Sequence, residues 1–250
     1  MNLKSTSLHD KIIECLGYLN PERSSHVCMD IGSSNITNIP YELLINGKLS
    51  ILIEPKNSKL NVLQNKYQSI QNMIYLNQLA TPENIGNIIT EYIKNEEITL
   101  LDIDIDSYDF EVLQELLKFK KPCIIVAEIN EKIPFPIRFH VKYNHTWDTS
   151  HFFGMSFRSF CDLVKQDYDV VDLNRNNAIA IRKDINTMTV TSSHEEIFNY
   201  GYKNPRINGH LAIFDHNSNV DHWLTMETEQ CVEEIEKFFI QYKGKYYIGT

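Results

Sequence analysis

Short apolar runs alternate with amphipathic stretches along most of the chain. The apolar runs predict strands over residues 26–30, 50–54, 72–76, 99–105 and 123–129. Between them, apolar residues recur every three or four positions, which predicts helices. These helices are expected over residues 10–19 and 41–45, around Leu60, Leu63 and Tyr67, from Thr81-Pro82-Glu83 onward, over 110–117 and from near Ser156. Such alternation is typical of a mostly parallel sheet covered by helices.

The last two predicted strands break this alternation. Residues 168–173 and 178–182 flank the turn Asn174-Arg175-Asn176-Asn177, so they form an antiparallel hairpin. A reversed strand at this point is the usual ending of a methyltransferase sheet and is absent from a plain dinucleotide-binding fold. We therefore predict an α/β, Rossmann-like methyltransferase fold with seven strands, mostly parallel, and a terminal antiparallel hairpin.

The segment after Lys183 has a weaker pattern. Helical spacing returns only over 227–242, where Cys231, Ile235 and Phe238 would share a face. We divide the chain into an N-terminal helix (1–24), a methyltransferase domain (25–184) and a C-terminal cap or oligomerisation segment (185–250). The cap and a contact between copies of the chain both remain open for this last segment.

Charge and composition narrow the choice of partners. The chain has 250 residues and a net charge of −9, which argues against nucleic acid as the main partner. No apolar run has the length of a membrane span, and the polar residues 1–10 do not resemble a targeting peptide, so a cytoplasmic location is expected. Five scattered cysteines without a CxxC pair predict buried thiols and not a disulfide or zinc framework.

The first two strands end in residues suited to an adenosine-type cofactor. Asp30-Ile31-Gly32 closes the first strand, where Gly32 permits close approach of a ligand and Asp30 can accept from an ammonium group. Glu54 closes the second strand and is placed to bind both ribose hydroxyls. The loop Gly32-Ser33-Ser34-Asn35 lacks GxGxxG, which disfavours a nicotinamide-dependent oxidoreductase, although an ordinary strand–turn–helix remains open. The complete candidate set for the cofactor is Asp30, Gly32, Ser33, Glu54, Pro55, Asn77 and Asp104.

A run of alternating carboxylates follows in the fourth strand. Strand alternation predicts Asp102, Asp104 and Asp106 on one side, where like charges need a compensating cation. Glu128 and Asn130 end the neighbouring fifth strand, so they should meet Asp104 and Asp106. This hard-oxygen set suits Mg²⁺, Mn²⁺ or Ca²⁺, with Asp104, Glu128 and Asn130 as the predicted metal ligands. For Asp102 and Asp109 we favour solvated or helix-capping roles.

Three segments resemble the FkbM-like methyltransferases, which methylate hydroxyls of sugars and other natural-product scaffolds. These segments are residues 28–32, residues 53–55 and residues 104–113. Thr81-Pro82-Glu83-Asn84-Ile85 and the stretch from Trp147-Asp148 to Phe153-Gly154 also resemble bacterial relatives linked to surface polysaccharide synthesis. The chain departs from the family pattern at Asp106-Ser107, where an acidic-Gly pair is usual, and in the missing later glycine of the first loop.

The stretch Asp104-Ile105-Asp106-Ser107-Tyr108 is similar to the Asp-x-Asp-x-Tyr motif of macrocin-type sugar O-methyltransferases, which use a divalent metal. This resemblance implies that Asp104 binds metal and that Asp106 acts as a base. His140 and His145, in the loop after the fifth strand, are further candidates for the base. His216 and His222 would join the substrate pocket if the tail folds over it.

The sequence thus predicts an S-adenosylmethionine-dependent O-methyltransferase that acts on a sugar hydroxyl, in a nucleotide-activated sugar or a polysaccharide precursor. Mg²⁺ or Mn²⁺ is the candidate metal, and a homo-oligomer is compatible with the tail. The alternative is a catalytically degenerate methyltransferase fold that serves in binding or assembly.

Overall fold

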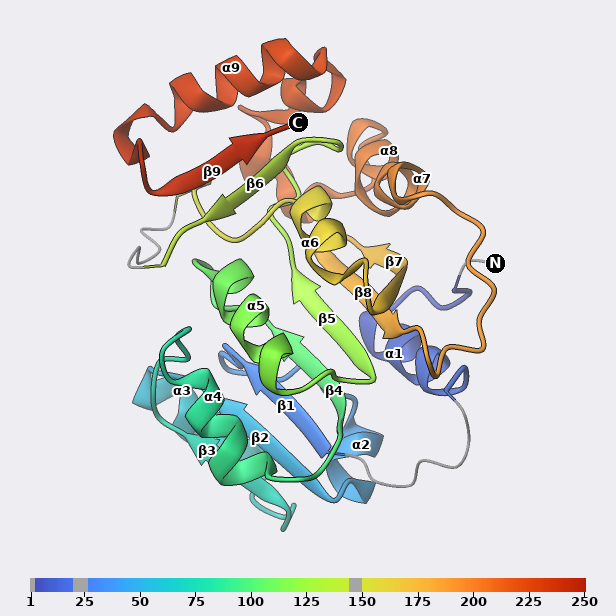
Figure 1. The fold of residues 1–250 in the computed structure, drawn as a ribbon, viewed down its shortest axis with the longest axis vertical. Coiled ribbons are helices and arrows are strands. Elements are labelled where there is room, and N and C mark those ends of the chain that lie inside the picture. Colours follow the sequence, from blue (N-terminus) through green and yellow to red (C-terminus); the bar gives the residue numbers. More distant parts are fainter. Residues whose placement is uncertain (1–2, 20–26, 144–149) are drawn as a thin grey trace.

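The computed structural model describes residues 3–19, 27–143 and 150–250, and its central element is a seven-stranded sheet (Figure 1). The strand order is β3-β2-β1-β4-β5-β8-β7. The strands are β1 (Val27–Ile31), β2 (Leu49–Ile53), β3 (Met73–Leu76), β4 (Ile98–Ile103), β5 (Ile124–Glu128), β7 (Tyr168–Asn174) and β8 (Asn177–Arg182). Strands β1 to β5 pair in parallel, whereas β8 runs antiparallel to both β5 and β7. The predicted Rossmann-like methyltransferase fold and its terminal hairpin are therefore confirmed.

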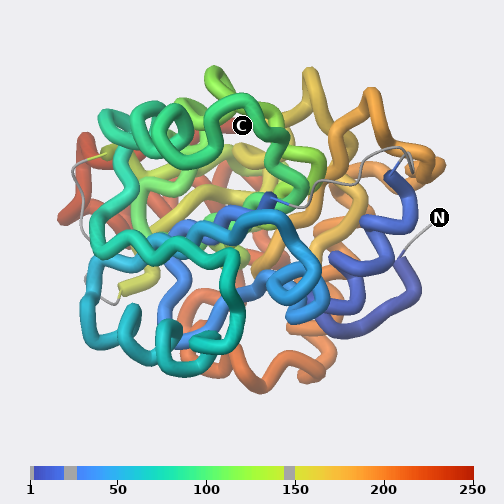
Figure 2. The backbone as a smooth tube through the Cα atoms, turned by 90° about the horizontal axis from the view of Figure 1, so that it is seen from below, coloured from blue at the N-terminus to red at the C-terminus, as the bar shows by residue number. Residues whose placement is uncertain are grey.

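Helices cover both faces of this sheet (Figures 1 and 2). One face carries α4 (Ile85–Ile88), its π-helical continuation (Ile89–Ile93), α5 (Asp109–Phe119), α6 (Phe157–Val164) and α7 (His194–Phe198). The other face carries α1 (Leu8–Leu16), α2 (Tyr41–Asn46) and α3 (Asn57–Lys66). Successive side chains of a strand point to opposite faces. Met29 therefore joins the first core and Cys28 the second.

The helix expected from Thr81 onward begins one turn later than predicted. The Thr81 hydroxyl accepts from the Asn84 amide at 3.2 Å, and the Asn84 side chain accepts from the Thr81 amide at 2.8 Å. This reciprocal pair closes a turn over 82–84, and regular α-helix starts at Ile85. Pro82 is therefore a turn residue, not the first residue of the helix.

A second, two-stranded sheet lies beyond the edge toward which β4 and β5 point (Figure 1). It pairs β6 (Arg138–Val141) with β9 (Tyr246–Gly249) in antiparallel fashion. The C-terminal tail, residues 185–250, continues after α7 with a π-helical turn (Asn199–Lys203), α8 (Asn204–Ile207) and α9 (Thr228–Phe238). It also contains 3-10 turns at Ala212–Asn217, Asp221–Thr225 and Ile240–Tyr242, and it ends in β9. A third apolar core joins Phe139 of β6 and Phe152 of the loop that follows β6 to Trp223 and Phe239 of the tail. The tail is thereby fixed to the segment that follows β5.

The predicted strands after β5 were incomplete, because neither β6 nor β9 was expected. The predicted helix over 227–242 is present as α9 and the turn that follows it. Among residues 3–19, 27–143 and 150–250, no helix combines the length and the apolar character needed to cross a membrane.

Candidate functional site

The loop after β1 passes directly over the end of β4. Gly32 has φ +94°, and its amide donates to the Ile53 carbonyl at 2.9 Å. A Cβ atom on Gly32 would lie 1.7 Å from the Asp104 carbonyl oxygen, so only glycine fits here. Ser33 is buried, and its hydroxyl donates to the Asp30 carbonyl at 3.2 Å. The turn is thus fixed by backbone contacts to the ends of β2 and β4.

Glu54 stands at the carboxyl end of β2, beside this turn. One of its oxygens accepts from the Ser34 amide at 3.1 Å, and the other accepts from the Lys56 amide at 2.7 Å. The Asn77 side chain donates to the Glu54 and Pro55 carbonyls, each at 3.0 Å, and so supports the loop that carries Glu54. Asn77 and Pro55 are exposed, and their contact with the cofactor stays a prediction.

Asp30 and Asp102 form a buried carboxyl pair on adjacent strands, opposite each other in the β1–β4 register. The Thr37 hydroxyl donates to one oxygen of Asp30, and the Asn38 side chain donates to one oxygen of Asp102 at 3.1 Å. The second oxygen of each carboxyl is buried and has no hydrogen-bond partner in the part of the chain that the structure describes. Burial raises the pKa of Asp30 to about 6 and that of Asp102 well above its ordinary value. The expectation that Asp102 is solvated or caps a helix is therefore wrong, since it faces the core beside Asp30.

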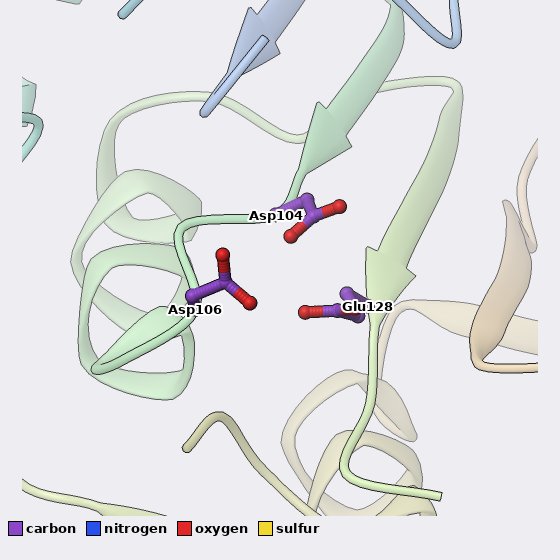
Figure 3. Close-up of side chains that lie close together, drawn as sticks. All are labelled: Asp104, Asp106 and Glu128. Carbon is purple, nitrogen blue, oxygen red and sulfur yellow. The ribbon is translucent and has the colours of Figure 1, made fainter. Parts of the chain in front are cut away.

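Asp104, Asp106 and Glu128 point toward one another and form what we call the carboxylate cluster (Figure 3). Asp104 follows the end of β4, Asp106 lies in the next loop, and Glu128 ends β5. One oxygen from each lies within 4.8 Å of the others. Ligand oxygens on one Mg²⁺, Mn²⁺ or Ca²⁺ ion are separated by up to about 4–5 Å, so these three side chains can bind a single cation.

Mutual repulsion and burial raise the pKa values of the three side chains in the carboxylate cluster, so they resist full ionisation. Burial, partly opposed by a hydrogen bond to Glu128, raises the pKa of Asp104 to about 6. Burial and the Asp104 charge raise the pKa of Glu128 well above its ordinary value, and burial also raises that of Asp106. The charges of Lys59, Lys132 and Lys56 partly offset this effect at Asp106. A divalent cation would compensate the remaining negative charge.

Asp109 holds the loop that carries Asp106. It is fully buried at the start of α5, and its two oxygens accept from the Ile105 amide at 2.8 Å and the Ser107 amide at 3.1 Å. Between those two amides, Asp106 takes φ +59°, a left-handed conformation that non-glycine residues rarely adopt. The interpretation of Asp109 as a solvated residue is wrong, while its place at the helix start is as expected.

Asn130 follows β5 and holds the next loop through one end of its side chain. Its side-chain nitrogen donates to the carbonyls of His151 and Phe153, each at 2.9 Å. Its side-chain oxygen is buried and has no hydrogen-bond partner among the described residues, so its role as a metal ligand stays a prediction. The structure adds Asp106 to the predicted ligands Asp104 and Glu128. Glu128 is positioned from the hairpin turn, where the Asn176 side chain donates to it at 2.7 Å. This contact links the reversed strand to the site.

The two histidines predicted as bases have different outcomes. His140 is stacked on Phe110 with ring centroids 3.9 Å apart, and Tyr247 stacks against it at 5.4 Å. Burial lowers the pKa of His140 to about 4, so the ring is neutral and serves in packing between α5 and the small sheet. His145 lies outside the described residues, as do Trp147, His26 and the predicted helix stop at Asn20-Pro21. His222 is exposed and hydrogen-bonded to Glu234 of α9, whereas His216 lines a pocket beside the tail.

No protein-family model matches the chain, and no curated protein matches it in sequence. Solved structures do align with it. An rRNA methylase from Streptococcus thermophilus aligns at 9% identity over 73% of this chain and 99% of that one, with a TM-score of 0.44. The N-methyltransferase NodS from Bradyrhizobium japonicum aligns at 9% identity over 69% and 94%, with a TM-score of 0.43. An S-adenosylmethionine-dependent methyltransferase from Clostridium acetobutylicum aligns at 10% identity over 71% and 92%, with a TM-score of 0.42.

Proposed function

We propose that this chain is an S-adenosylmethionine-dependent O-methyltransferase that acts on a sugar hydroxyl, in a nucleotide-activated sugar or a polysaccharide precursor. One observation carries the proposal. The glycine turn at Gly32, the Glu54 side chain and the carboxylate cluster all lie at the C-terminal edge of the parallel strands. In the same sheet, β8 is reversed between β5 and β7. Ligands of open α/β sheets bind at this edge.

The residues present fit the cofactor. Glu54 keeps lone pairs beyond the two backbone amides it accepts, so it can also accept from both ribose hydroxyls. Asp30 and Asp102 each have a buried oxygen without a donor among the described residues. The ammonium group of the cofactor is a donor of opposite charge that these oxygens could accept from. Gly32 leaves the backbone open to close approach at the same place.

For this reaction the chain has to position the acceptor hydroxyl and remove its proton. S-adenosylmethionine, when bound, supplies the methyl group, which transfers to oxygen by in-line displacement. Asp106 accepts the proton of the sugar hydroxyl, and its raised pKa makes it a stronger base than an exposed aspartate. Asp104 and Glu128 would hold a divalent cation, whose charge would lower the hydroxyl pKa. Asp109 keeps Asp106 in place through the loop amides.

Glu54→Ala should weaken S-adenosylmethionine binding about tenfold or more, because each hydrogen bond to a charged group contributes about 1.5–3 kcal/mol. Isothermal titration calorimetry on the wild type and the variant measures this directly. Glu42→Ala, on the exposed face of α2, is the matched control and should bind like the wild type. An absence of binding by the wild type, or equal binding by Glu54→Ala, would contradict the cofactor assignment.

The function itself is tested by incubating the protein with S-adenosylmethionine, Mg²⁺ or Mn²⁺ and a library of nucleotide-sugars. Mass spectrometry should find one product that has gained a single methyl group. The same reaction with excess chelator should stop if the cation is required. Full activity in chelator would refute the metal while leaving the methyl transfer in place.

One feature favours the alternative of a degenerate scaffold used for binding or assembly. Where a later glycine of the first loop is usual, Ser34 occupies a left-handed conformation at φ +51°. A protein that binds the cofactor but methylates none of the sugars in the library would favour this alternative.

A further inference from the structure

We propose that the pocket between the loop after β5 and the C-terminal tail binds the acidic substituent of a sugar acceptor, with Lys132 as its counter-charge. This inference rests on the proposed function, because it assigns the class of acceptor. The shared ligand chemistry is an oxyanion attached to a sugar ring, either the carboxylate of a sugar acid or the phosphate of an activated sugar.

The pocket has the size and lining for such a ligand. Its volume is about 390 Å³, within the usual range for small-molecule sites. Phe153 comes from the loop, and Phe238 and Tyr242 come from the tail. Aromatic rings of this kind can pack against the apolar face of a sugar. The tail is therefore an integral wall of the pocket.

Lys132 is buried, and within residues 3–19, 27–143 and 150–250 its ammonium group has one hydrogen-bond partner, Glu131. Its ammonium group is 3.3 Å from a Glu131 oxygen and 4.1 Å from the centroid of the Phe153 ring. An ammonium group has three donors, and a charge-assisted hydrogen bond is normally about 2.7–2.9 Å long. Glu131 is therefore a loose partner, and an oxyanion in the pocket would supply a closer one.

Glu131 is fixed behind the lysine and not in the pocket. It is buried, does not line the pocket, and accepts from the Asn217 side chain at 2.6 Å. The other titratable groups that line the pocket are His151, His216 and Tyr242, none of which is acidic at neutral pH. Burial and the nearby Lys132 charge lower the pKa of His151, consistent with a positive field here. The pocket thus favours an anion over a cation.

Lys132 lies four residues after Glu128, the residue that ends β5 and belongs to the carboxylate cluster. Selectivity for an acidic sugar would follow from the contact between the oxyanion and Lys132.

Binding to the full chain should be measured by calorimetry in chloride buffer, without phosphate or sulfate. The three probes are methyl glucuronoside, glucose 1-phosphate and the neutral methyl glucoside. We expect at least one charged probe to bind ten times more tightly than the neutral one. Lys132→Met should remove that difference, and Lys142→Met, an exposed lysine beside the small sheet, should keep it. The charged probe that binds more tightly identifies the source of the oxyanion.

Lys132→Met leaves Glu131 without its ion pair, so Lys132→Met/Glu131→Gln is measured beside it. Equal binding of charged and neutral probes by the wild type overturns the inference, and so does charge selectivity that survives both variants. The proposed function is tested separately by S-adenosylmethionine binding. Cofactor binding without charge selectivity would refute only the pocket assignment. Lys132-dependent charge selectivity without cofactor binding would refute only the methyltransferase proposal.

Discussion

Gly32→Ala should lower the free energy of unfolding by more than about 3 kcal/mol, since it combines left-handed strain with a backbone clash. The new Cβ would lie 1.7 Å from the Asp104 carbonyl oxygen and 2.6 Å from its carbonyl carbon. A backbone neighbour cannot rotate away as a side chain can, so either the turn or the end of β4 must move. Urea denaturation measures the loss, and cofactor binding should fall with it.

Gly244→Ala separates the clash from the strain. Gly244 has φ +88°, close to that of Gly32, but apart from its chain neighbours no atom in the described part of the chain lies within 4 Å of the position that its Cβ would take. The loss expected there is about 1 kcal/mol, from backbone conformation alone. If Gly32→Ala and Gly244→Ala destabilise the protein equally, the contact between the first loop and Asp104 does not have the importance assigned to it.

Asp104→Asn should stabilise the protein at pH 8 when no divalent cation is present. The folded pKa of Asp104 is raised to about 6, from an ordinary value of 3.8. Between these values the folded chain keeps a proton that the unfolded chain has released. This carboxyl therefore lowers stability progressively as pH rises, and its full cost is present above pH 6. Removing it should gain up to about 3 kcal/mol at pH 8 and about half of that at pH 5.

A divalent cation should offset most of this stability difference between Asp104→Asn and the wild type at pH 8. Mn²⁺ or Mg²⁺ at a hundred times its dissociation constant would stabilise the wild type by about 2.7 kcal/mol, and Asp104→Asn much less. Thermal unfolding at pH 5 and pH 8, with chelator or with Mn²⁺, gives the comparison. Titrating groups that do not interact with Asp104 cancel in the difference, whereas relief of the repulsion on Glu128 adds to the stabilisation of the variant. A variant less stable than the wild type in chelator at pH 8 would contradict the raised pKa of Asp104, and equal stabilisation of both proteins by Mn²⁺ would contradict the cation site.

The sheet was predictable from the sequence because a buried strand requires a continuous run of apolar residues. Each parallel strand is an apolar run, and the reversed hairpin is marked by the polar turn Asn174–Asn177 between two such runs. The positions of Gly32 and Glu54 followed from the same pattern, since both come directly after a strand.

The carboxylates were harder to place because strand alternation stops earlier than the sequence suggests. β4 ends at Ile103, where the Asp104 amide still bonds to the Ile31 carbonyl before the chain turns through the left-handed Asp106. Asp102 therefore faces Asp30 inside the sheet, while Asp104 and Asp106 meet Glu128 at its edge. The pair Asp106-Ser107 does not predict the left-handed conformation of Asp106, whereas a glycine at this position would have indicated it.

The strands β6 and β9 were missed because each is four residues long and finds its partner far along the chain. Phe139 and Val141 do alternate with Arg138 and His140, but so short an alternation does not separate a strand from a loop. The pocket was missed for the same reason, since its walls come from the loop after β5 and from the tail.

The pairing of β6 with β9 also bears on the order of folding. It joins residues about 110 positions apart, so its loop-closure entropy is larger than that of the local β7–β8 hairpin. Contacts so distant in sequence are expected to form late and to open first in partial unfolding. A chain in which this pairing has opened would keep the sheet edge proposed for the cofactor while losing support for the part of the tail that lines the pocket proposed for the acceptor.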